Sequence, residues 1–160
     1  MPAPVPCLWF DGQAEQAARF YVDVFPRSEV TSVSRVRSEG PHGQPVGSAL
    51  TVAFVLDGQA FTALNGGPHF TFSPATSFTI SCADQSEVDH YWERLGEGGE
   101  HGPCGWLTDR FGLSWQVVPT RLVELLEDPD DARADRAMQA MLQMTRLDVA
   151  TLERAADDAG

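Results

Sequence analysis

The chain has 160 residues, of which 42% are hydrophobic and 21% charged, and its net charge is −12 at pH 7. This composition is typical of one compact globular protein rather than of a disordered chain. No apolar run approaches the roughly 18 residues that a membrane span needs, so no membrane association is expected. The acidic charge would repel a phosphate backbone, which disfavours nucleic acid as a partner. The chain has no lysine, and this excludes a Schiff-base mechanism.

The cysteines and the start of the chain indicate a reducing compartment. Cys7, Cys82 and Cys104 are an odd set without CxxC spacing, so the sequence predicts reduced thiols rather than a disulfide framework or a zinc ribbon. The opening MPAPVPCLWF lacks a basic region followed by a long apolar stretch. We therefore expect a cytoplasmic protein.

The first half of the chain predicts a strand, a helix and three further strands. These elements are expected at residues 6–11, 13–25, 30–37, 49–56 and 60–64. In the helix, Ala14, Ala17, Ala18, Tyr21 and Phe25 recur at spacings of three and four, which is the apolar stripe of a helix packed on a sheet. Asp57 and Gly58 suit the positive φ angles of a tight hairpin turn. The stretch 38–47, rich in glycine and proline, predicts a mobile loop that could close over a cleft.

The second half repeats this order and then departs from it. A strand, a helix and a hairpin are expected at residues 77–84, 86–95, 105–108 and 113–118, and helices at 121–126, 130–144 and 148–156. Asp130 or Asp131 can cap the longest helix, and Asp148 precedes the last one. The predicted apolar face of the longest helix, 130–144, comprises Ala134, Ala137, Met138, Met141, Leu142 and Thr145. This helical tail could pack on the chain's own sheet or on a partner subunit.

Two similar units of about 60 to 70 residues would each struggle to cover an apolar sheet face alone. Their pairing would form a curved sheet with a cleft inside. We therefore predict an α+β protein with a paired-module domain over residues 1–120, its modules at about 5–67 and 76–120. A helical extension is expected over residues 121–160.

Three segments resemble a known family. CLWFDGQAEQAARFYVDVFPRSEV, FTALNGGPHFTFSPATSF and GWLTDRFGLSWQVVP are similar to the PhnB-like branch of the vicinal oxygen chelate superfamily, which includes glyoxalase I, bleomycin-resistance proteins and extradiol dioxygenases. The resemblance covers about residues 6–120. It implies paired βαβββ modules and, commonly, a homodimer. Such proteins are often labelled 3-demethylubiquinone-9 3-methyltransferase, yet no strand here leads into a Gly-rich nucleotide-binding turn.

The resemblance also bears on metal binding. In the superfamily's enzymes His or Gln on the first strand of a module and Glu on the last hold a divalent metal. These positions fall near Pro6 and Ser77 on the opening strands, at Gln116 on the last strand of the second module, and at Ala63 or Asn65 in the first module. The anionic and imidazole ligands that a 2+ ion prefers are missing. We expect no built-in metal and no cofactor.

Four histidines and one cysteine are the other candidates for chemistry. His69 could be a ligand-binding donor or a general base, because its ordinary pKa lies near neutrality. It could equally be a turn histidine bonded to backbone. Cys104 could be a nucleophile or a structural thiol. His42, His90 and His101 are expected on the surface or in loops.

Large aromatic residues on the predicted strands are the best candidates for a binding surface. Strand residues alternate between faces, so about half of these rings should face the concave side: Trp9, Phe10, Phe72, Phe78, Trp106 and Trp115. Burial in the core explains any one of them equally well. With neutral polar groups nearby, the pattern favours a mostly apolar pocket for an uncharged molecule. The predicted ligand-binding residues are Trp9, Asn65, His69, Phe78, Trp106, Trp115 and Gln116.

Three functions remain open. The first is a metal-free protein that binds a small organic molecule and works as a homodimer. The second is a glyoxalase-like or dioxygenase-like enzyme that uses His69 or an exogenous metal. The third is a protein interaction module whose working surface is the helical tail.

Overall fold

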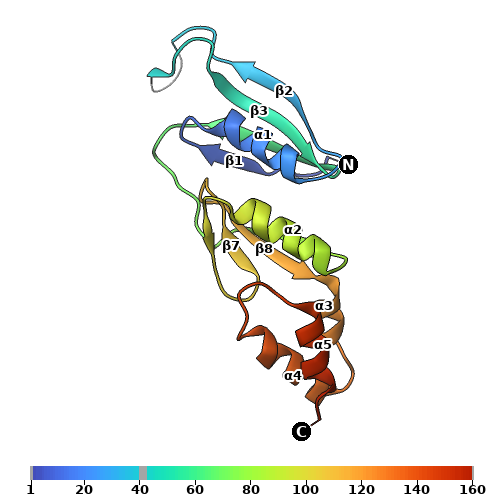
Figure 1. Cartoon of the computed structure of the whole chain (residues 1–160). Helices are drawn as coiled ribbons and strands as arrows, with labels where there is room; N and C mark the ends of the chain where they lie inside the picture. The colour runs from blue at the N-terminus through green and yellow to red at the C-terminus, as the bar shows by residue number, and fades with distance from the viewer. Residues whose placement is uncertain (1, 40–42, 160) are drawn as a thin grey trace. The chain divides into compact units, whose positions relative to one another are not determined.

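The computed structural model describes residues 2–39 and 43–159. The chain divides into two compact units, Met1–Phe72 and Ser73–Gly160. Each contains a mixed four-stranded sheet with a helix packed on it (Figure 1). In the described part of the chain, no helix is long and apolar enough to cross a membrane. The predicted mobile loop includes residues 40–42, which lie outside the described residues, as does His42.

The first unit has the predicted order of strand, helix and three strands. Its elements are β1 (Cys7–Phe10), α1 (Ala14–Val24), β2 (Glu29–Arg35), β3 (Ala49–Leu56) and β4 (Gln59–Asn65). The strands lie in the order β1-β4-β3-β2, in which β1 and β4 are parallel and the other pairs antiparallel. Asp57 and Gly58 have φ angles of 45° and 88°, so the predicted tight turn is confirmed.

One face of the first sheet is covered by α1. The helix buries Ala14, Ala17, Ala18, Tyr21 and Val24. Phe25, which the sequence placed on this stripe, is instead the extended residue that ends the helix. Tyr21 packs on Phe54 of β3 with ring centroids 6.3 Å apart. This helix–sheet contact is the core of the first unit.

The second unit repeats the topology and adds the helical extension. Its sheet elements are β5 (Ser77–Cys82), α2 (Gln85–Gly96), β6 (Glu100–His101), β7 (Trp106–Thr108) and β8 (Ser114–Pro119). The strand order β5-β8-β7-β6 matches that of the first sheet position by position. The predicted duplication is therefore confirmed. Only the two-residue strand β6 was missed, because it lies in a glycine-rich loop too short to show a pattern.

Helix α2 covers one face of the second sheet and begins with a variant of the capping box, in which Glu87 bonds the residue before the N-cap Asp84. Asp84 accepts a hydrogen bond from the backbone N–H of Glu87 at 3.0 Å, and the Glu87 side chain accepts from the N–H of Ala83 at 2.8 Å. The helix buries Val88, Tyr91, Trp92 and Leu95. We call the other face of the second sheet, which α2 does not cover, the open face.

Three helices follow β8: α3 (Thr120–Leu126), α4 (Asp131–Met141) and α5 (Val149–Asp157). All three were predicted, and the side chains of Asp130 and Asp148 cap α4 and α5 as expected. They share a core of Leu122, Leu125, Ala137, Leu147, Leu152 and Ala156. The predicted apolar face of α4 was partly wrong, because Met138 and Leu142 are 42% and 50% exposed. The helix buries Ala137 and packs Ala140 and Met141 against the core instead.

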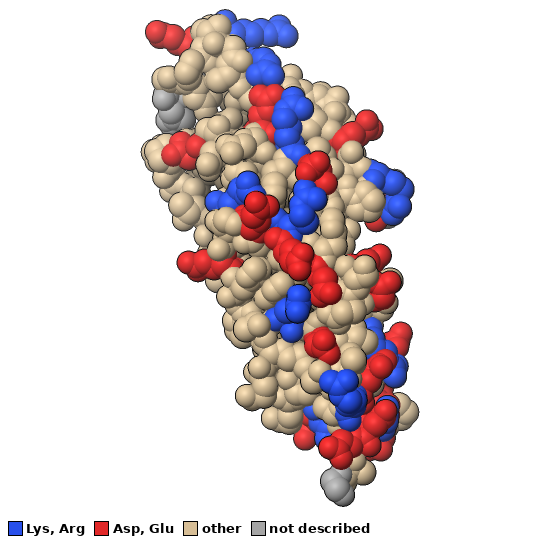
Figure 2. Space-filling view, in the orientation of Figure 1, with Lys and Arg blue, Asp and Glu red and all other residues tan. Residues whose placement is uncertain are grey.

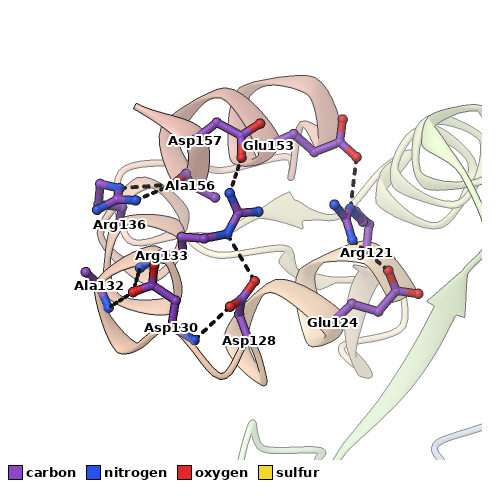
Figure 3. Close-up of polar contacts among 10 residues, drawn as sticks. All are labelled: Arg121, Glu124, Asp128, Asp130, Ala132, Arg133, Arg136, Glu153, Ala156 and Asp157. Carbon is purple, nitrogen blue, oxygen red and sulfur yellow. Dashed lines mark hydrogen bonds and ion pairs between the residues drawn. The ribbon is translucent and has the colours of Figure 1, made fainter. Parts of the chain in front are cut away.

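Ion pairs link the three helices on their outer side (Figure 3). Arg133 of α4 pairs with Asp128 at 3.0 Å and also with Asp157 of α5. Arg121 of α3 pairs with Glu153 of α5 at 2.9 Å. Figure 2 shows basic and acidic side chains mixed over the visible face at this end of the chain. Exposed pairs contribute little singly, so the buried apolar core does most to hold the helices together.

Candidate functional site

The open face of the second sheet carries hydroxyls, an amide and one large aromatic side chain. In the strand registers Gln116 of β8 lies beside Thr79 of β5 and Trp106 of β7. Ser114 lies in the same way between Ser77 and Thr108. Register partners point to the same side of a sheet, so these side chains share one face. The face is therefore polar around the indole of Trp106 and neutral on β5, β7 and β8, while Glu100 of β6, the register partner of Thr108, places a carboxylate at its edge.

Two of these residues are joined by a direct hydrogen bond. The Gln116 side-chain amide donates to the Ser77 hydroxyl with Nε2 and Oγ 2.9 Å apart. The family resemblance assigns metal ligands to these two positions, and the fold brings them together. A neutral amide and a hydroxyl do not fit a divalent metal, which prefers carboxylate or imidazole. Among the described residues, no group of three or more His, Cys, Asp or Glu side chains could hold a metal ion.

A cavity of about 440 Å³ lies beside this pair, at the β6–β7 end of the sheet. Its volume is in the range of small-molecule sites. The lining includes Glu100, Gly102, Pro103, Trp106, Thr108 and Ser114. Trp106 is half-buried, so part of its indole is available to a ligand. Trp106 is thus the one predicted site residue that lines this cavity.

Trp115 and Phe78 belong to the opposite face. Their rings pack with centroids 5.7 Å apart, and Trp115 is only 3% exposed. Its indole N–H donates to Asp109 Oδ2 at 2.9 Å. The expectation that Trp115 and Gln116 line one concavity is wrong, because neighbouring residues of a strand point to opposite faces. Trp115 therefore acts in the core between the sheet and α2.

Trp9 lies in the first unit, on the edge strand β1 of its sheet. Its indole N–H donates to the carbonyl of Gly67 at 2.9 Å, and its ring meets Phe70 edge-on with centroids 4.9 Å apart. A Cβ on Gly66 would lie 2.4 Å from the Trp9 ring. Glycine is thus required at position 66 for the indole to fit. Trp9 is half-buried and beside Leu64 in the register.

Asn65 has a structural task that accounts for its burial. It is 5% exposed; its Oδ1 accepts from the backbone N–H of Ala14 at 2.9 Å, and its Nδ2 donates to the carbonyl of Ala49 at 2.9 Å. Gln13 at the N-cap of α1 makes no side-chain cap bond. Asn65 therefore supplies from β4 the cap that α1 lacks locally. Both ends of its amide are used within the protein.

A second cavity, of about 380 Å³, lies next to Asn65 in the first unit. Sequence reasoning did not find it. Its lining includes Glu15, Arg35, Gln44, Ser48 and Asn65. Hydrogen bonds from Arg19 and Arg35 lower the pKa of Glu15. The charges at this cavity are thus already paired, since Arg35 lies 3.1 Å from Glu15.

The remaining candidates are His69 and the cysteines, none of which is a lining residue of the cavity in the second unit. His69 is exposed in the turn after β4. The cysteines are free, as predicted. Burial raises the pKa of the Cys82 thiol to about 12, which disfavours its reactive thiolate. Trp9, Asn65 and His69 belong to the first unit and the other predicted site residues to the second, so their convergence on one site stays a prediction.

The repeated βαβββ order, with one sheet face covered and the other open, defines a protein of the vicinal oxygen chelate class. The family described as 3-demethylubiquinone-9 3-methyltransferase matches residues 2–118. The chain belongs to this family, the PhnB-like branch of the superfamily. A PhnB protein of Bacillus cereus is 32% identical, with a TM-score of 0.66 over 74% of this chain and 99% of that chain.

More distant structures share the fold. A Pseudomonas aeruginosa protein is 20% identical, with a TM-score of 0.60 over 74% of this chain and 98% of that chain. The fosfomycin resistance protein FosX of Listeria monocytogenes, solved with Mn(II) and sulfate, is 18% identical, with a TM-score of 0.51 over 72% of this chain and 89% of that chain. No curated protein matches the chain. Family and fold support a small-molecule binding protein of this superfamily.

Proposed function

We propose that the protein binds a small uncharged organic molecule on the open face of its second sheet, without a metal. The observation that carries the proposal is the neutral Gln116–Ser77 pair at the position where the superfamily's enzymes hold a metal, beside the half-buried Trp106. The bond between the pair uses an N–H of Gln116, so its carbonyl oxygen can still accept from a ligand. A flat or apolar ring would stack on the indole of Trp106.

The charge around the site supports an uncharged ligand. Thr79, Thr108 and Ser114 offer only hydroxyls, and the nearest acidic side chain of the cavity lining is Glu100 on the edge strand. No arginine lines the cavity to meet a ligand anion, and the one imidazole of the lining, His101, has its Nε2 3.0 Å from the carbonyl oxygen of Trp92. A neutral ligand with one or two polar groups would satisfy the hydroxyls and the amide without the desolvation cost of a charge.

We do not expect a methyltransferase activity, although the family's name suggests one. Both described sheets are mixed and four-stranded. A dinucleotide-type cofactor site would need a Gly-rich turn between a parallel strand and a helix. The turn between β5 and α2 is instead Ala83 and Asp84, and Asp84 is engaged in the capping box.

A thermal-shift screen of uncharged ring compounds tests binding, followed by tryptophan fluorescence titration of the best compound. Gln116→Ala should weaken binding by about 1–2 kcal/mol through one lost buried hydrogen bond, and Trp106→Ala should weaken it further. Gln59→Ala, an exposed change on β4, is the matched control. Unchanged affinity in both site variants would refute the proposed site.

Elemental analysis of the purified protein tests the metal-free part of the proposal. Less than stoichiometric Zn, Ni, Fe or Mn is expected after mild chelation, because Ser77 and Gln116 offer no anionic ligand. The double variant Ser77→His with Gln116→Glu should gain affinity for Mn²⁺. About one tightly bound metal ion per wild-type chain would overturn the proposal.

A further inference from the structure

The loop from Gly102 to Trp106 has two neighbours. The cavity of the second unit lies against Gly102, Pro103 and Trp106. The C-terminal extension bonds to the residues between them: the backbone N–H of Cys104 donates to the carbonyl of Met144 at 2.9 Å, and that of Gly105 donates to the carbonyl of Thr145 at 2.8 Å. This short loop therefore lines the cavity and also forms hydrogen bonds with the C-terminal extension.

The backbone of this loop requires support. Cys104 has a φ of 56° and Gly105 a φ of 81°. The left-handed region is unfavourable for a residue with a side chain and persists where surrounding contacts hold it. The two hydrogen bonds to the extension satisfy the amides of these same two residues. Without them, both N–H groups would need other partners and the loop could relax.

Leu147 is the side chain that fills the space behind the loop. It is fully buried, and a Cβ on Gly105 would lie 2.9 Å from its Cδ1. On its other side, Gln85 of α2 donates to the carbonyl of Leu147 at 3.0 Å and accepts from the N–H of Val149 at 2.8 Å. The segment from Met144 to Val149 therefore ties the loop before β7 to the start of α2.

The extension also meets the open face directly. Val118 of β8 lies two residues after Gln116, on the same face, and packs against the core of the three helices. Yet the family match ends at residue 118. The extension is thus an addition of this chain that contacts the sheet at two places next to the proposed ligand.

We propose that the C-terminal extension positions the cavity wall, with Leu147 as the positioning residue that fixes the Gly102–Trp106 loop and hence the Trp106 indole. One consequence, that the extension determines which ligands fit the cavity, rests on the proposed function. The placement of Trp106 itself can be measured without any ligand.

The test uses the full-length protein labelled with 5-fluorotryptophan, in which fluorine NMR reports each tryptophan separately. Trp106→Phe assigns the resonance. Leu147→Ala should shift or broaden the Trp106 resonance and leave that of Trp9, in the first unit, in place. Leu152→Ala is the matched control, since Leu152 is also fully buried in the same core but belongs to α5. It should lower the unfolding temperature without moving the Trp106 resonance.

Ligand binding is then compared with coumarin, an uncharged flat ring, as the probe. Its affinity should fall several-fold in Leu147→Ala, stay near wild type in Leu152→Ala, and recover in the conservative Leu147→Met. If Leu147→Ala does not fold, Gln85→Ala, which loosens the Leu147–Val149 segment without touching the cavity, takes its place.

The outcomes separate the two proposals. Equal effects of Leu147→Ala and Leu152→Ala on the Trp106 resonance, or none from either, would overturn the positioning role. A Trp106 shift confined to Leu147→Ala, with no coumarin binding by the wild-type protein, would support the positioning role and count against the proposed ligand class.

Discussion

The indole of Trp115 and the carboxylate of Asp109 are joined by a 2.9 Å hydrogen bond, and each residue is 3% exposed. The other carboxylate oxygen accepts from the backbone N–H groups of Phe111 and Leu113 at 2.8 and 3.1 Å. Asp109 thus closes the β7–β8 hairpin and binds it to the core. A buried carboxylate is tolerated because these donors satisfy it.

Trp115→Phe should destabilise the protein by about 1–3 kcal/mol, because it removes the indole N–H that donates to a buried oxygen of Asp109. Urea unfolding monitored by circular dichroism measures the change. Trp106→Phe, on the open face, is the matched control and should lower the free energy of unfolding by less. Equal losses in the two variants would show that the Asp109 bond contributes nothing of its own.

Asn65→Ala should destabilise the first unit by about 2–3 kcal/mol, since it removes both the cap of α1 and a buried bond to β3. Gln13→Ala should change the free energy of unfolding little, because Gln13 makes no side-chain cap bond although it sits at the N-cap. The same urea titration compares them. A larger loss in Gln13→Ala would mean that the cap is local after all.

Much of the fold was predictable because its signals are local. The positive φ angles of the Asp57-Gly58 turn and the small, regularly spaced residues of α1 are properties of short segments. The strand β6 has only two residues and no period to detect. The end of α4 was placed three residues too late, since Leu142 to Met144 are compatible with a helix and continue instead in a turn.

The site was less predictable because its residues are defined by contacts distant in sequence. The β8 sequence SWQVVP alternates, with Ser114 and Gln116 in one phase and Trp115 and Val117 in the other, so it indicates opposite faces for Trp115 and Gln116 but not which distant residues each face meets. Asn65 is explained by partners 51 and 16 residues away. The alternating hydroxyls of β5, by contrast, could have been read as one polar face.

The exposed apolar side chains of α4 bear on assembly. Met138 and Leu142, four residues apart, are 42% and 50% exposed and lie on one side of the helix end. We expect a homodimer, and light scattering should give twice the 17.4 kDa of one chain. Replacing both residues by serine should lower the measured mass if they lie in the dimer contact. A mass of one chain for the wild-type protein at micromolar concentration would contradict the expectation.

The carboxylates at the ends of the extension helices predict a loss of stability in acid. The backbone N–H of Asp130 and the Arg133 guanidinium lower the pKa of Asp128 below its ordinary value of 3.8. Hydrogen bonds from Thr151 likewise lower the pKa of Asp148. Below about pH 4 the unfolded chain therefore binds more protons at these groups than the folded one does.

The contribution of these groups to stability is accordingly present above pH 4 and is lost as the pH falls below it. Thermal unfolding followed by far-ultraviolet circular dichroism between pH 3 and 7 should show a falling midpoint at the acid end. Asp128→Asn removes one titrating group and keeps its size, so the variant should start less stable and lose less on acidification. An acid dependence as steep as that of the wild-type protein would show that Asp128 is not among the groups responsible.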